Sequence, residues 1–143
     1  MRDYDPDRPR EGCVIVQGTS TTANLIEVWD QLPNVKIVQA ASQDLFRRQD
    51  EDYRNSVLTP ADRADSTIAS NGSRISMQAW IFNEISREYA LTSDWDDRWR
   101  TGGNGEEICE EAHISPGQLL AGIRKFAEDR PARLKRMREA IPE

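Results

Sequence analysis

Two short runs of strand-forming residues near the N-terminus, with a helical pattern between them, restrict the folds open to this chain. The first run is CVIVQ at residues 13–17 and the second is VKIVQA at residues 35–40. A turn rich in hydroxyl residues (GTSTT, 18–22) precedes apolar residues at helical spacing, which are Leu25, Ile26, Trp29 and Leu32. A strand–helix–strand unit crosses over right-handed and pairs its strands in parallel. The pattern therefore predicts an α/β protein.

The same alternation continues along the chain. Residues 66–70 (STIAS) predict a third strand, and residues 88–95 (EYALTSDW) can hold a fourth. The helix expected between them carries Met77, Ile81, Phe82, Ile85 and Tyr89. Helices and strands that alternate in this way form layers, so we expect a three-layer α/β/α sandwich whose mostly parallel sheet has about five strands.

Capping signals locate the C-terminal helices. Asn104 followed by Glu107, and Ser115 followed by Gln118, are the spacing of a capping box, and Pro116 suits the first helical position. The expected divisions are a linker at residues 1–11, where Pro6 and Pro9 disfavour regular structure, a domain at 12–129 and a basic amphipathic helical tail at 130–143.

Composition limits the partners and the compartment. The 143 residues suit a single domain, and a formal net charge of −6 disfavours binding to nucleic acid or to anionic lipid. The sequence contains no apolar stretch near the ~20 residues that span a bilayer, and its first residues lack a signal peptide. The two cysteines, Cys13 and Cys109, have no metal-binding spacing and are expected to be buried free thiols. We therefore expect a cytoplasmic protein.

Residues with reactive side chains are few. His113 is the one histidine, which leaves a metal site or a nucleophile–base pair without its usual partners. The turn at Gly18, Thr19, Ser20 and Thr21 could hold a small anion at a helix N-terminus, although a plain helix cap accounts for the same residues. It lacks the glycine pattern and the lysine of nucleotide-binding loops.

The segment SDWDDRWR contains residue types that are frequent at binding hot spots. Two interpretations remain open for it. Trp95, Arg98, Trp99 and Arg100 either form a surface for a partner or consist of core tryptophans beside solvated arginines.

A longer segment, SQDLFRRQDEDYRNSVL at residues 42–58, carries a family resemblance. The positions concerned are Ser42, Leu45, Phe46, Gln49, Asp50, Tyr53, Arg54, Val57 and Leu58. With VIVQGTSTTANLIEVWDQL before it and EEAHISPGQLLAGIRKF after it, the chain resembles the C-terminal domain of transketolases over roughly residues 12–127. It departs from that pattern in the turn after the first strand, in SDWDDRWRTGG and in the basic tail.

This resemblance implies a role within a larger enzyme. Transketolases transfer two-carbon ketol units between sugar phosphates in pentose phosphate metabolism, and they use thiamine diphosphate and a divalent metal such as magnesium. A pyrophosphate-binding and a pyrimidine-binding domain hold these groups, and both precede the C-terminal domain. The resemblance thus implies a domain or separate subunit that is inactive alone, with no catalytic, cofactor-binding or metal residue, and that packs with those domains or forms a homodimer. The alternative is a free-standing α/β module that binds a small anion or regulator at Gly18–Thr21.

The residues themselves indicate how this connector is built. Leu45 and Phe46 are expected to dock on the edge of the sheet while the charged helix after them turns outward, and Thr59 with Pro60 starts the next turn.

Overall fold

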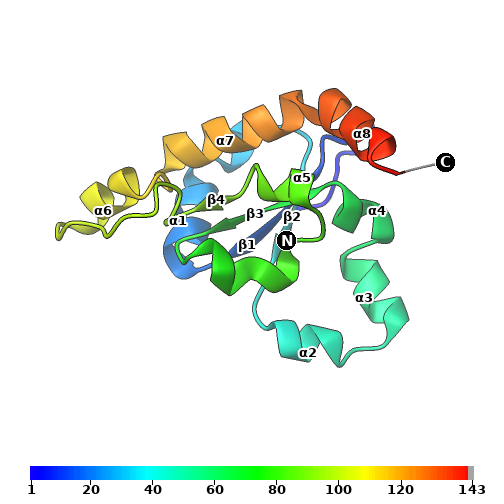
Figure 1. The fold of residues 1–143 in the computed structure, drawn as a ribbon, viewed down its shortest axis with the longest axis horizontal. Coiled ribbons are helices and arrows are strands. Elements are labelled where there is room, and N and C mark those ends of the chain that lie inside the picture. Colours follow the sequence, from blue (N-terminus) through cyan, green and yellow to red (C-terminus); the bar gives the residue numbers. More distant parts are fainter. Residues whose placement is uncertain (142–143) are drawn as a thin grey trace.

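A single parallel sheet organises the chain, for which a computed structural model describes residues 1–141. Its strands are β1 (Cys13–Gln17), β2 (Lys36–Gln39), β3 (Ser66–Ser70) and β4 (Leu91–Thr92), in the order β2-β1-β3-β4 (Figure 1). All neighbouring pairs in this sheet are parallel, as the strand–helix–strand pattern predicts. The sheet has one strand fewer than the expected five. After β4 the chain enters a glycine-containing loop and then only helices.

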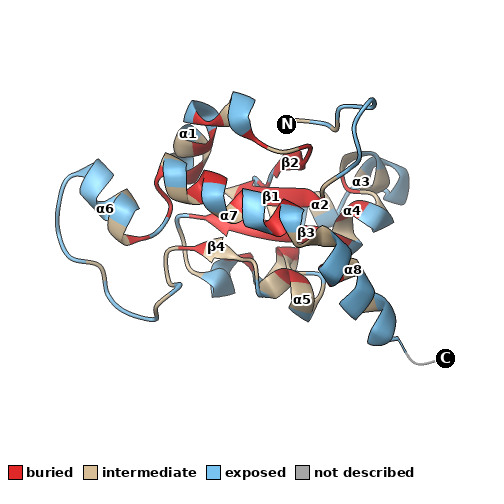
Figure 2. Cartoon of the chain, turned by 90° about the horizontal axis from the view of Figure 1, so that it is seen from above, coloured by how far each residue is buried: buried red, intermediate tan, exposed pale blue. Residues whose placement is uncertain are grey.

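Helices cover both faces of the sheet. Those of the described residues are α1 (Thr19–Glu27), α2 (Gln43–Arg47), α3 (Glu51–Val57), α4 (Pro60–Ala64), α5 (Glu84–Arg87), α6 (Gly105–Glu111), α7 (Pro116–Glu128) and α8 (Arg130–Glu139), with 3-10 turns η1 (Trp29–Gln31) and η2 (Arg74–Trp80). Val14 and Val16 point to a core shared with α1 and α7, while Cys13 and Ile15 point to a second core that includes η2. Alternation along β1 thus produces the predicted three layers. Figure 2 shows the buried strands between exposed helix faces.

The region between β3 and β4 differs from the single helix that apolar spacing predicts. Met77 and Trp80 are buried on η2, where residues three apart lie on one face. The Asn83 side chain then accepts a hydrogen bond from the Ser86 amide and starts the short helix α5. A separate cap at Asn83 divides the segment into two turns, and Phe82 between them is partly exposed.

Residues 1–11, expected to form a linker, lie along the edge strand β2. The backbone of Arg2 pairs with Ile37, and its guanidinium donates to the carbonyls of Pro33 and Val35 at 2.6 and 3.0 Å. The buried Asn34 amide donates to the carbonyls of Arg8 and Pro9. Because the edge of a sheet leaves backbone groups unpaired, a segment that contains prolines can still bind there.

The tail is helical from Arg130 to Glu139, and ion pairs of Arg130 and Arg133 with Asp65 hold this helix against the start of β3. Arg133 on α8 is completely buried, and its guanidinium contacts Asp65 at 2.5 Å and the Phe126 carbonyl at 2.9 Å. Arg130 contacts the other oxygen of Asp65 at 2.5 Å. Ile141, which follows the helix, is exposed. Residues 142–143 of the predicted tail lie outside the described residues.

Candidate functional site

The connector after β2 folds into two short helices that project from the body of the molecule (Figure 1). The Ser42 hydroxyl accepts a hydrogen bond from the Leu45 amide and starts α2, and the Asp50 carboxylate accepts one from the Tyr53 amide and starts α3. Neither helix contains a buried residue. Such short helices gain stability mainly from packing of an apolar face, and these two leave much of that face open.

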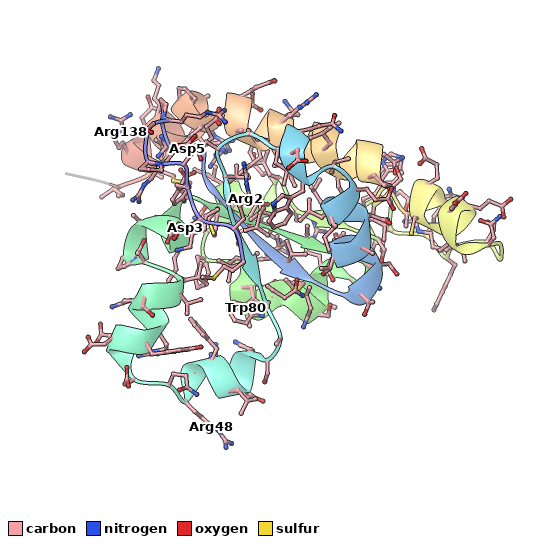
Figure 3. The ribbon with its side chains drawn as sticks, turned by 180° about the vertical axis from the view of Figure 1, so that it is seen from behind. Arg2, Asp3, Asp5, Arg48, Trp80 and Arg138 are labelled. Carbon is pink, nitrogen blue, oxygen red and sulfur yellow. The ribbon has the colours of Figure 1, made fainter. Side chains whose placement is uncertain are left out.

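Between this arm and the sheet lies an apolar hollow of about 210 Å³, which we call the connector groove. Its lining residues are Val38, Gln39, Ala40, Ala41, Ser42, Leu45, Phe46, Gln49, Tyr53, Val57, Leu58 and Trp80. The Phe46 ring packs against the buried Trp80 ring, with centroids 5.3 Å apart. In Figure 3, Arg48 lies at the outer end of the arm and Trp80 beside the sheet. The groove therefore opens at the arm and has an aromatic floor.

Two large apolar side chains of the groove are exposed. Leu45 is 62% exposed and Tyr53 is 50% exposed, although both line the hollow. The expectation that Leu45 docks on the sheet is therefore wrong, while Phe46 does dock, on Trp80. The five-residue helix α2 turns only one apolar side chain toward the body. Exposed aromatic and aliphatic side chains around a hollow are typical of a surface that contacts another protein.

The groove brings the resembling positions together. Of the nine positions, seven line it, and Asp50 caps the helix that carries Tyr53. The Nε of Arg54 is buried without a hydrogen-bond partner in the described residues. Sequence reasoning missed Trp80, the floor of the groove, although Trp80 follows Met77 by three residues, a spacing that keeps both side chains on one face of a helix. That spacing was the available signal.

The turn considered for an anion, Gly18 to Thr21, forms the start of α1. Gly18 has a φ of 100°, a value that favours glycine, and α1 begins directly after it without a side-chain cap. Thr21 is fully buried, and its hydroxyl has no partner within residues 1–141. The hollow that Gly18 and Thr19 line has no lysine or arginine in its lining. The described lining of this hollow therefore offers an anion no cationic side chain.

His113 stacks on a tryptophan, Cys13 lies in the sheet and Cys109 lies on α6. The His113 ring stacks on Trp95 with centroids 3.9 Å apart and an angle of 16°. Cys13 is buried in the sheet, where burial raises the pKa of its thiol, so it is poorly reactive. Cys109 is free but only half-buried, so the expectation of buried free thiols holds fully for Cys13 alone. Within residues 1–141 no three His, Cys, Asp or Glu side chains are grouped to hold a metal ion.

The tryptophans of the segment SDWDDRWR (93–100) lie on the surface of the molecule. Trp99 is 96% exposed and Trp95 about half exposed, so neither is a core tryptophan. Arg98 and Arg100 are both engaged in ion pairs with Asp96. The alternative of core tryptophans is therefore wrong, and the alternative of a surface for a partner stays a prediction.

Comparison with known proteins adds no family. No protein-family model matches the sequence, and no curated protein matches it significantly. Across residues 1–141, no helix has the length and apolar character needed to cross a membrane. The resemblance to transketolases therefore depends on the residues named above.

Proposed function

We propose that the chain is the C-terminal domain, or a separately encoded subunit, of a transketolase-like enzyme that transfers two-carbon ketol units. Its role is in assembly. One observation carries the proposal: seven of the nine positions that resemble the family line a single open groove. Leu58, Phe46 and Val57 also pack on the core beside Trp80, whereas Leu45 and Tyr53 stay exposed, and exposed apolar positions are the ones that a docking surface would use.

The energetics of the groove support docking. Fully burying a leucine or aromatic side chain contributes about 1.5–3 kcal/mol, and Leu45 and Tyr53 leave much of that contribution unused in the free chain. The arm also offers Arg47, Arg48 and the acidic run Asp50 to Asp52 around the groove as exposed polar neighbours. An apolar centre with a polar rim is the usual anatomy of a protein–protein interface.

The chain's own residues do not fit a thiamine diphosphate and magnesium site. They offer no grouped metal ligands in the described part and no G-D-G…N sequence anywhere in the chain. In the proposed enzyme those groups belong to the pyrophosphate-binding and pyrimidine-binding domains, and no chemical step is assigned to this chain. The free thiols Cys13 and Cys109 fit a reducing, cytoplasmic location.

The proposal is tested by capture of the tagged chain from its source cells, followed by native mass measurement. We expect a complex with a larger chain, and we expect that complex, after denaturation, to release thiamine diphosphate in a stoichiometric amount. A chain that elutes alone, or with a partner that carries no thiamine diphosphate, would contradict the proposal.

A further inference from the structure

A second surface lies in the loop between β4 and α6. Trp99 is almost fully exposed there, yet its loop is held by specific contacts. The Arg100 guanidinium donates to the Ser93 and Glu111 carbonyls and pairs with Asp96, whose pKa this hydrogen bond lowers to about 2. The loop therefore presents a large apolar ring to solvent from a fixed framework.

Beside Trp99 is a hollow of about 540 Å³, which we call the loop hollow. Its wall includes Ser73, Ser93, Asp94 and Asp97, together with the two arginines of the loop. Ser73 follows β3 and Ser93 follows β4, so the hollow lies beyond the carboxyl ends of these strands.

The arginines of the loop hollow are in ion pairs, whereas Asp94 and Asp97 are in none within residues 1–141, although both oxygens of Asp94 accept hydrogen bonds from the Arg74 amide. Arg98 contacts Asp96 at 2.6 Å and Glu111 at 3.4 Å, and Arg100 is paired as described. Burial raises the pKa of Asp94, but hydrogen bonds from the Thr92 side chain and the Arg74 amide lower the pKa by more than burial raises it. The net pKa lies below the usual value, so the carboxyl is ionised near neutral pH. The charge of the Arg74 side chain also lowers the pKa of Asp94.

We propose that the loop hollow binds the guanidinium group of an arginine presented by a partner polypeptide. Trp99, Asp94 and Asp97 line the same hollow, so an arginine side chain that enters it can stack on the indole and donate to a carboxylate. A planar guanidinium satisfies both contacts better than an ammonium group, which is compact and strongly hydrated. This proposal rests on the charges and exposure of the loop and is independent of the family resemblance.

The test uses the whole chain and a defined probe. The peptide N-acetyl-Gly-Arg-Gly-amide is titrated at constant ionic strength while the indole N–H signal of Trp99, identified with a Trp99→Phe variant, is followed by NMR. We expect saturable binding with a Kd on the order of millimolar, as suits a single exposed cation–π and ion-pair contact. Asp97→Asn should weaken it about tenfold, whereas Asp52→Asn, at an exposed acid on α3, should leave it unchanged.

Two further probes decide the chemistry. The same peptide with citrulline, which is neutral and nearly isosteric with arginine, and the peptide with lysine should both bind more weakly. Equal shifts with citrulline, equal binding of lysine, unchanged binding to Asp97→Asn, or no saturation with the arginine peptide would each overturn the proposal.

Discussion

Replacing Asp65 with alanine is expected to lower the free energy of unfolding by about 3–5 kcal/mol. Asp65 is the shared partner of Arg130 and the fully buried Arg133 at the amino-terminal end of the sheet. Without it, the Arg133 charge stays buried among Phe126 and Tyr89 with only a carbonyl as acceptor. Domains of this kind have only about 5–15 kcal/mol of total stability, so the loss should clearly lower the midpoint of urea denaturation.

Two matched variants separate a buried charge from a general loss of contacts. Asp65→Ala combined with Arg133→Met removes both charges and should recover much of the lost stability. Glu88→Ala removes the partner of Arg136 in an exposed pair and should lower the free energy of unfolding far less than Asp65→Ala does. If the free energy of unfolding of Asp65→Ala lies within about 1 kcal/mol of that of the parent chain, the buried pair does not anchor α8 as described.

Leu45→Asp is expected to weaken binding to the captured partner about 100-fold, which corresponds to about 2.7 kcal/mol. The substitution places a charge at the exposed apolar wall of the connector groove, where docking would bury it without a partner. The chain itself should keep its free energy of unfolding within about 0.5 kcal/mol, because Leu45 is already exposed. Titration calorimetry with the purified partner measures the first effect and urea denaturation the second.

Ile26→Asp provides the matched control. Ile26 is an exposed aliphatic residue on α1 with the same 62% exposure as Leu45, and it lies outside the connector groove. It should bind the partner like the parent chain. Equal weakening by both variants would point to a nonspecific charge effect, and no weakening by Leu45→Asp would remove the groove from the interface.

Local patterns gave the elements that were predicted correctly. The capping boxes expected at Asn104 and Ser115 involve residues three apart. The Asn104 box forms in both directions, whereas at Ser115 the amide and the hydroxyl both donate to the Gln118 side chain. The strands follow from short runs that only a buried sheet accommodates. Ile26 was placed on the buried face of the first helix because spacing alone does not define the width of that face, and it is exposed.

Features that depend on long-range contacts were not predictable from the sequence. Asp65 and Arg133 are 68 residues apart, and nothing in either local pattern indicates the pair. Residues 1–11 bind along β2 because β2 is an edge strand, and this position is known only once the order of the strands in the sheet is known. For the site, the motif residues were recognised in advance, but their convergence on Trp80 required the position of η2.

The most direct test of the account is a ketol-transfer assay with thiamine diphosphate and magnesium on three samples: this chain alone, its captured partner alone, and the two combined. The account predicts activity in the combined sample that exceeds either component at least about tenfold, and a Leu45→Asp chain that restores it only at much higher concentration. Ketol transfer by the partner alone at the full rate, or none in the combined sample, would contradict an assembly role in a transketolase-like enzyme.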